Sequence, residues 1–332
     1  MTAASFTSAS LPAKRVLVTG GAGFIGSHLV DALAKGSPPA LVVVDNFFLG
    51  KHENLAQARQ TYPDLVVEKT DVSDAEALRT VVERHGIEVV FDLATVPLPY
   101  SLEFPAATIH ENVGMAINVS ELARSGLIET LVHASTSEVY GTAITVPMAE
   151  DHPLVPRTPY AASKAAADHI VASYVATFGI DAAVIRPFNN YGPRQNEGSY
   201  AGLIPLTIRR ALAGEPILVH GDGEQTRDFI FVTDTIAGIL AAYEERGTRG
   251  AVVNLASGVE VSVNTVVGHI VDALEVEATV RHVEPRPGDV RRHAGSNGLA
   301  RRLLGFQPSI PLAEGMAETV AWYLRVLEGT GP

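Results

Sequence analysis

Tyr160 and Lys164 are the two side chains of this sequence best placed for chemistry, because they lie four residues apart in a segment expected to open a helix. Residues at that spacing share one helix face, so a phenol and an ammonium can contact the same ligand. We expect the Lys164 charge to lower the pKa of Tyr160 and so to make the phenol a general base for a hydroxyl group. A surface tyrosine and lysine on an amphipathic helix give the same pattern, so the spacing needs support from other residues.

Thr136, Ser137 and Glu138 supply that support. They follow an apolar strand expected at residues 130–134 and place two hydroxyls beside a carboxylate. In an open parallel sheet, ligands bind at the carboxyl ends of the strands. We therefore predict that these three residues share a catalytic site with Tyr160 and Lys164.

A glycine-rich turn begins the elements that must position this site. A strand expected at 15–19 runs into glycines at positions 20, 23 and 26, and a helix is expected at 27–35. Such a turn lets a pyrophosphate approach the backbone and places it at the helix N-terminus. The next strand, 41–44, ends at Asp45, whose carboxylate can accept hydrogen bonds from an adenosine ribose and repels a 2′-phosphate. The pattern predicts NAD rather than NADP, with a plain strand-end carboxylate as the alternative interpretation of Asp45.

Strand and helix patterns alternate along the first half of the chain, with further strands expected at 65–68, 89–93 and 182–185. This alternation predicts an α/β fold, a Rossmann-type doubly wound parallel sheet with a smaller C-terminal substrate-binding domain. We expect a flexible tail at 1–13, an NAD-binding domain at 14–185 that residues 233–256 rejoin, and a mainly substrate-binding region at 186–332. Residues 97–101 contain too many prolines for a helix or a central strand, so a loop over the site is expected there.

Composition narrows the classes of function and of partner. The 332 residues carry a formal net charge of −12, which argues against nucleic acid as a partner. No cysteine occurs, which excludes disulfides and thiolate metal sites and fits a cytoplasmic protein. We expect neither a membrane partner nor a metal, because no apolar run reaches membrane-spanning length and no histidine stands in ligand spacing with a carboxylate. His133 and the other ten histidines are assigned structural or surface roles.

Several motifs in one order give the chain a resemblance to a known family. It resembles the extended short-chain dehydrogenase/reductase superfamily, specifically the NAD-dependent nucleotide-sugar epimerases, dehydratases and decarboxylases. The motifs are VTGGAGFIGSHLV, the Asp45–Asn46 pair, TSEVYG, YAASK, RPFNNYGPRQ and GDGEQTRDFIFVTD. The resemblance covers nearly the whole chain after the first thirteen residues, and the set of motifs is far more specific than any one of them.

The resemblance implies roles for individual residues. Thr136 is expected to hydrogen-bond a sugar 4-hydroxyl, Tyr160 to take its proton, and Lys164 to bond the nicotinamide ribose; Asp71 can equally begin a helix. Arginines suit a diphosphate because they bind it bidentately, although surface solvation is the alternative for Arg227 and Arg286. The superfamily commonly dimerises through the helix that carries Tyr160, so a homodimer is expected. The residues expected to bind NAD are Gly20, Gly23, Phe24, Ile25, Gly26, Asp45, Asn46, Asp71, Val72, Leu93, Ala94, Thr95, Tyr160 and Lys164. Those expected to bind the substrate, foremost a UDP-sugar, are Pro99, Tyr100, Arg157, Asn189, Arg194, Arg227 and Arg286.

The reaction that follows C4 oxidation has three possible outcomes. Glu138 favours elimination or decarboxylation, because ordinary 4-epimerases of this superfamily place small residues there. The strings TSEVYGTA, PYS and TRDFIFV are most similar to UDP-N-acetylhexosamine-type 4,6-dehydratases, so a 4,6-dehydratase acting on a UDP- or dTDP-hexose is preferred. Ser137 stands where dTDP-glucose 4,6-dehydratases have aspartate, which leaves the acid for the departing hydroxyl unassigned.

Two features favour the alternatives. Arg157, three residues before Tyr160, resembles the pattern of UDP-glucuronate decarboxylases. The segment GPRQNEGSYAGLIP resembles the loops of UDP-hexose 4-epimerases, so a 4-epimerase acting on a UDP-hexose or on UDP-glucuronate is the other alternative. A protein that senses NAD without catalysis is disfavoured, because it has no need for a matched Thr136, Tyr160 and Lys164.

Overall fold

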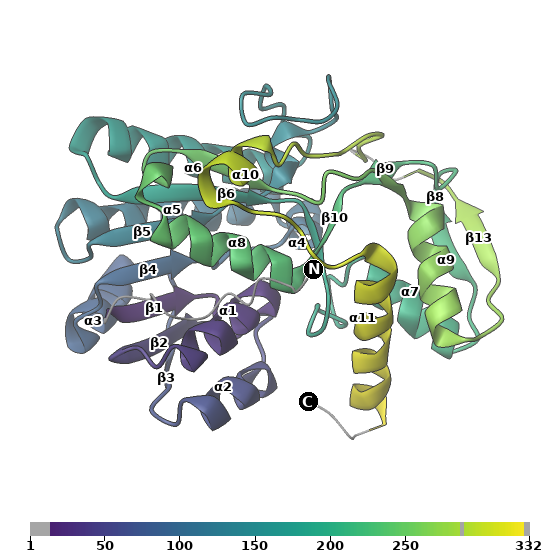
Figure 1. Cartoon of the computed structure of the whole chain (residues 1–332), viewed down its shortest axis with the longest axis horizontal. Coiled ribbons are helices and arrows are strands. Elements are labelled where there is room, and N and C mark those ends of the chain that lie inside the picture. Colours follow the sequence, from purple (N-terminus) through teal and green to yellow (C-terminus); the bar gives the residue numbers. More distant parts are fainter. Residues whose placement is uncertain (1–13, 286–288, 329–332) are drawn as a thin grey trace.

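A seven-stranded parallel sheet is the centre of the computed structural model, which describes residues 14–285 and 289–328 (Figure 1). The spatial order of its strands is β11-β6-β5-β4-β1-β2-β3: β1 to β3 are added toward one edge of the sheet and β4 to β11 toward the other, so the strand order reverses between β1 and β4. This order is that of a doubly wound sheet, and it confirms the predicted fold class. The strands are β1 (Arg15–Thr19), β2 (Ala40–Asp45), β3 (Val66–Lys69), β4 (Val89–Asp92), β5 (Thr130–Ala134), β6 (Ala182–Pro187) and β11 (Val252–Leu255).

Helices cover both faces of this sheet because its strands are apolar on both sides. In β1, Val16 and Val18 join the core on one face, whereas Leu17 joins the core on the other, as the period of two of a strand requires. Figure 1 shows one face covered by α1 (Phe24–Lys35), α8 (Val232–Glu244) and α10 (Gly298–Leu304). The opposite face carries α3 (Ala75–His85), α5 (Pro105–Arg124) and α6 (Pro159–Phe178).

Helix α6 brings Tyr160 to the carboxyl edge of the sheet. The helix begins at Pro159, and the Thr158 hydroxyl caps it by accepting from the Ala161 amide at 3.2 Å. Proline suits the first turn because its missing N–H has no partner there anyway. Tyr160 is therefore fixed in the first helical turn, and Lys164 lies one turn further along.

Residues 97–101, predicted as a loop, belong instead to a short helix, α4 (Leu98–Glu103). The prediction is wrong because prolines interrupt a helix only beyond its first turn. Pro97 is the residue before the helix, and Pro99 lies within its first two positions, where backbone N–H groups have no helical partner.

The C-terminal elements form a second, smaller core beside the sheet (Figure 1). Its strands pair two by two: β7 (Asn189–Tyr191) with β10 (Phe229–Phe231), β8 (Ile217–His220) with β13 (Val280–Val283), and β9 (Thr226–Arg227) with β12 (Val261–Ser262). Its helices are α7 (Leu203–Leu212), α9 (Val263–Leu274) and α11 (Leu312–Leu327).

Strand β11 and helix α8 lie with the large sheet, β11 beside β6 and α8 against α1. Helix α10 packs there too, beyond the segment expected to rejoin it. The domain boundaries at 185 and at 233–256 remain a proposal.

Short elements complete the fold: α2 (Ala56–Thr61) and the 3-10 turns η1 (His52–Leu55), η2 (Ser137–Tyr140) and η3 (Arg246–Thr248). Within the described residues, no helix combines the length and apolar character needed to cross a membrane.

Candidate active site

A cavity of about 530 Å³ opens at the carboxyl ends of the strands, at the point where the strand order reverses. We call it the first cavity. Every residue predicted to bind NAD lines it, from the glycine turn after β1 to Tyr160 and Lys164 on α6. An open α/β sheet binds its ligands at this position.

The glycine turn forms a cradle that side chains would fill. Gly20 has a φ of +64°, and a Cβ on it would lie 2.9 Å from the Ala94 nitrogen. A Cβ on Gly26 would lie 2.2 Å from the Gly20 oxygen. Gly23 precedes α1 and offers no side-chain cap, so the first amides of the helix are left for a ligand. A bare helix N-terminus of this kind suits the pyrophosphate of a dinucleotide.

Asp45 lies at the end of β2, buried on the wall of the first cavity. Its two oxygens accept from the backbone amides of Ala22 at 2.9 Å and Phe47 at 2.8 Å. These bonds fix the carboxylate, although burial raises its pKa. A ribose hydroxyl must therefore share these oxygens through their remaining lone pairs.

Asp71 is a cavity residue rather than the start of a helix. Asn46 donates to its carboxylate at 2.9 Å, and both side chains line the first cavity. Helix α3 begins at Ala75, where Asp74 provides the cap by accepting from Ala77 at 3.0 Å. Asp71 therefore belongs to the cavity wall, and Asp74 is the residue that begins the helix.

A second cavity of about 430 Å³ adjoins the first. Thr136, Ser137 and Glu138 line it on one side, and Asn189 and Arg227 line it from the smaller core. Tyr160 lines both cavities, so its phenol stands where a cofactor and a substrate would meet. The predicted catalytic residues are thereby gathered at one junction.

The pKa of Tyr160 departs from the prediction. Burial and the nearby Glu138 charge raise it to about 12, although hydrogen bonds with Thr136 and Thr95 oppose this shift. The Lys164 ammonium donates to the Ala134 carbonyl at 2.8 Å.

Glu138 and Arg227 give the second cavity its charges. Burial raises the pKa of the Glu138 carboxyl, the Arg227 charge opposes this, and the Asp289 charge adds to it. Arg227 is held by an ion pair with Asp289 and by the Val290 carbonyl at 2.7 Å. The arginine is thus fixed on the cavity wall, as recognition of an anionic ligand requires.

Four of the predicted substrate residues lie elsewhere than expected. Arg157 is exposed beside Gly141 and outside both cavities, because it directly precedes the cap of α6. Arg194 and Tyr100 line the first cavity, and an ion pair of 2.7 Å with Asp31 holds Arg194 there. Pro99 serves the start of α4 and lines neither cavity. Arg286 falls outside the described residues.

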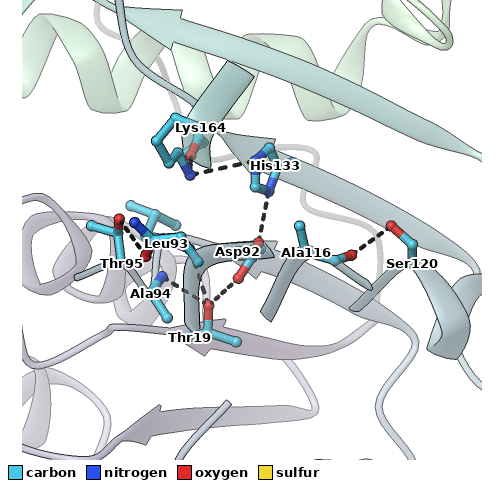
Figure 2. Close-up of polar contacts among 11 residues, drawn as sticks. Thr19, Asp92, Leu93, Ala94, Thr95, Ala116, Ser120, His133 and Lys164 are labelled. Carbon is cyan, nitrogen blue, oxygen red and sulfur yellow. Dashed lines mark hydrogen bonds and ion pairs between the residues drawn. The ribbon is translucent and has the colours of Figure 1, made fainter. Parts of the chain in front are cut away.

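Asp92 was assigned no role from the sequence, and His133 only a structural or surface role. They face each other on the adjacent strands β4 and β5, are buried, and form a chain of contacts with Lys164 (Figure 2). The available signal was a carboxylate and an imidazole at the same register of two otherwise apolar strands.

Comparison with known proteins shows the family. Residues 16–256 match the model of the NAD dependent epimerase/dehydratase family. The chain is 36% identical to a UDP-glucose 4-epimerase from Mycolicibacterium smegmatis, over 93% of this chain and 98% of the relative. It is also 36% identical to a dTDP-glucose 4,6-dehydratase from Streptomyces griseus, over 93% of each. A UDP-N-acetyl-alpha-D-glucosaminuronate decarboxylase from Bacillus cytotoxicus is 32% identical, over 94% of this chain and 98% of the relative.

Solved structures agree with the sequence matches. A UDP-glucose 4-epimerase from Thermotoga maritima, in complex with UDP-glucose, has a TM-score of 0.88 at 30% identity, covering 94% of this chain and 99% of that one. The dTDP-glucose 4,6-dehydratase DesIV from Streptomyces venezuelae, with NAD bound, has a TM-score of 0.87 at 33% identity, covering 94% and 98%.

The chain belongs to the NAD-dependent epimerase/dehydratase family. It is an enzyme, and its cofactor is NAD.

Proposed function

We propose that the enzyme is a nucleotide-sugar 4,6-dehydratase, which converts a nucleotide-diphosphate hexose to its 4-keto-6-deoxy derivative. One observation carries the proposal: Glu138 lies on the second cavity wall together with Thr136 and Tyr160. Of these three residues, the threonine and the tyrosine serve the oxidation at C4. A carboxylate beside them adds the group that an elimination requires.

Tyr160 takes the proton of the 4-hydroxyl, and Thr136 holds that hydroxyl by a hydrogen bond. Bound NAD supplies the hydride acceptor and donor, and its positive nicotinamide ring favours phenolate. Lys164 would hold the ribose next to that ring. With the C4 hydrogen leaving as hydride to the bound cofactor, C4 would become a ketone, which makes the C5 hydrogen acidic.

Glu138 then performs the elimination. Its carboxylate takes the C5 proton, the C–H electron pair becomes the C5–C6 double bond, and the C6–O bond breaks. The carboxyl returns the same proton to the departing oxygen, so water leaves and Glu138 is ionised again. Asp289, the other carboxylate found on this wall in the described chain, is paired with Arg227, which leaves Glu138 for both transfers. Return of the hydride to C6 and of one proton to C5, which balances the proton that Tyr160 took from the 4-hydroxyl, would complete the product.

The substrate class follows from the charges of the second cavity. Arg227 and Asn189 offer a guanidinium and an amide, the donors that a diphosphate needs, and we retain Arg286 as a further ligand. The Thermotoga maritima neighbour is solved with UDP-glucose, which supports a nucleotide sugar for this chain as well. We propose a UDP-sugar foremost.

Mass spectrometry of the product tests the proposal. The purified enzyme is incubated separately with UDP-N-acetylglucosamine, UDP-glucose, dTDP-glucose and UDP-glucuronate. Loss of water from one of the first three is the expected outcome. Glu138→Gln is expected to lower the rate of water loss by at least about a hundredfold. NADH should still form, because C4 oxidation does not use the carboxylate.

The matched control is Glu150→Gln, which changes another partly buried glutamate. Glu150 accepts from the Asn254 amide at 2.9 Å and lines neither cavity, so its replacement should leave product formation in place. Unchanged water loss in Glu138→Gln would remove this residue from the mechanism.

A 4-epimerase is the second candidate, because Thr136 and Tyr160 suffice for it and the Mycolicibacterium relative bears that name. An isomer of unchanged mass would establish it and reduce Glu138 to a positioning residue. Decarboxylation of UDP-glucuronate is the third outcome. Its support in the sequence, Arg157, lies exposed outside both cavities.

A homodimer also remains a proposal. Exposed apolar side chains on α4, α5 and α6 and at their ends support it: Leu102, Phe104, Ile109, Ile117 and Phe178.

A further inference from the structure

Three ionisable side chains from three elements meet beneath the first cavity. Asp92 ends β4, His133 belongs to β5 and Lys164 to α6, and each is at most 3% exposed. His133 Nδ1 lies 2.7 Å from Asp92 Oδ2, and Lys164 Nζ lies 3.4 Å from His133 Nε2 (Figure 2). The three groups form a chain that ends at the wall of the cofactor cavity.

The hydrogen bonds fix the protonation of this chain. Thr19 accepts the amides of Leu93 at 3.0 Å and Ala94 at 3.1 Å, so its own proton goes to Asp92 Oδ1 at 2.6 Å. Asp92 therefore accepts at Oδ1. Burial raises the pKa of this carboxyl, but the contact with His133 and the Thr19 hydrogen bond lower it overall, so the ionised form is favoured and Oδ2 can accept as well.

The imidazole must then place its proton on Nδ1, facing Asp92. Its Nε2 carries a lone pair and accepts from Lys164, which the structure places on that side (Figure 2). A second proton on His133 would set two cations side by side. Nε2 is therefore arranged to accept a hydrogen bond from the Lys164 ammonium.

Burial disfavours the protonated, charged form of Lys164. It lowers the pKa of the ammonium, whereas the Asp92 and Asp168 charges raise it. Asp168, on the same helix, is already paired with Arg186 at 2.8 Å. Tyr160 faces the site one turn earlier and is neutral at its raised pKa. Asp92 is thus the nearby carboxylate without a cation of its own, and His133 links it to Lys164.

We propose that Asp92 and His133 are positioning residues that keep Lys164 protonated and hold two of its three N–H bonds. One N–H points to the Ala134 carbonyl and one to His133, which leaves the third for the cofactor cavity. The functional consequence rests on the proposed role of Lys164 in C4 oxidation. The geometry itself is independent of the substrate.

The direct test is the titration of Lys164 in the protein without NAD. The chain contains five lysines, at positions 14, 35, 51, 69 and 164, so a lysine ¹³Cε NMR spectrum is simple and Lys164→Arg assigns the signal. Asp92→Asn keeps the shape of the side chain and removes its charge. We expect the midpoint of Lys164 to fall by about one pH unit or more in this variant.

His133→Asn is the second variant, in case Asp92→Asn fails to fold. The asparagine amide can replace Nδ1–H toward Asp92 but offers nothing in place of Nε2. A smaller fall of the Lys164 midpoint is expected. His152→Asn is the control, because His152 is also buried but binds the loop amide of Ile144 at 3.0 Å, away from Lys164.

The pH profile of NADH formation with the best nucleotide sugar gives the second readout. A merely structural role would lower the rate equally at all pH values, whereas loss of the Lys164 charge moves the alkaline limb to lower pH. A Lys164 midpoint within about 0.2 unit of wild type in both folded variants overturns the proposal. A shifted midpoint in an enzyme that oxidises no nucleotide sugar would instead contradict the proposed function alone.

Discussion

The two cavities share Tyr160 but are built in different ways. The first is lined mainly by residues 20, 23–26, 44–46, 48–51, 70–72 and 93–97, which lie at successive strand ends of one parallel sheet. The second gathers residues 135–138, 187–190, 202–204, 218, 220, 225, 227 and 229 with Asp289, which come from both cores. Backbone geometry makes the first cavity, and side chains brought together over long distances in the chain make the second.

This difference explains how one fold serves several reactions. Two relatives are each 36% identical to this chain, and one is named an epimerase and the other a dehydratase. Overall similarity therefore cannot decide the outcome. We propose that a few side chains on the second cavity wall, Glu138 above all, set the reaction without changing the fold.

Tyr160→Phe should have the largest effect, because this residue belongs to both cavities. Removing the phenol oxygen removes the base for C4 oxidation, so we expect NADH formation to fall by about 10²–10⁴-fold. Stopped-flow absorbance after mixing with the best substrate measures it. NAD and UDP should still bind.

Tyr174→Phe is the matched control, on the same helix. The Tyr174 hydroxyl bonds Glu121 at 2.6 Å and lines neither cavity. Full activity of Tyr160→Phe would show that another group removes the proton, and the cavities would then not share their catalytic residue.

Gly26→Ala should damage the first cavity alone. The added Cβ would lie 2.2 Å from the Gly20 oxygen, so the turn must move away from the position that a pyrophosphate needs. We expect the Kd for NAD to rise by more than about tenfold while UDP binding changes little. Isothermal titration calorimetry with each ligand measures both.

Gly268→Ala is the control for a glycine in a helix. A Cβ there meets nothing within 4 Å, so this change should stabilise the fold by about 0.5–1 kcal/mol and leave NAD binding intact. Equal loss of NAD and UDP binding in Gly26→Ala would mean that the cavities are not independent.

The same division sets how much the sequence could predict. Gly20, Gly26 and Asp45 were found because a strand, a tight turn and a helix are local features with known spacing. The contact between Asp92 and His133 joins residues 41 positions apart. Strand patterns locate each strand, but they do not say which polar ends become neighbours.

The arginines show the limit most clearly. Arginine attracts an anion wherever the chain places it, so its type alone cannot say which cavity it serves. Arg157 precedes a helix cap and is exposed. Arg194 itself has a φ of 66° and forms an ion pair with Asp31, which is distant in the sequence, so long-range packing decides its position.

Arg194→Ala gives the finest test of the division between the cavities. The sequence assigned Arg194 to the substrate, but the side chain lines the first cavity, and its Nη1 is buried without a hydrogen-bond partner among the described residues. A guanidinium N–H in that position can donate to an NAD phosphate, so we expect the Kd for NAD to rise by about tenfold and that for UDP to stay constant. Arg227→Ala should do the reverse, because Arg227 lines the second cavity. If Arg194→Ala weakens the binding of UDP instead, Arg194 binds the substrate as the sequence predicted, and the division into a cofactor cavity and a substrate cavity is wrong at this residue.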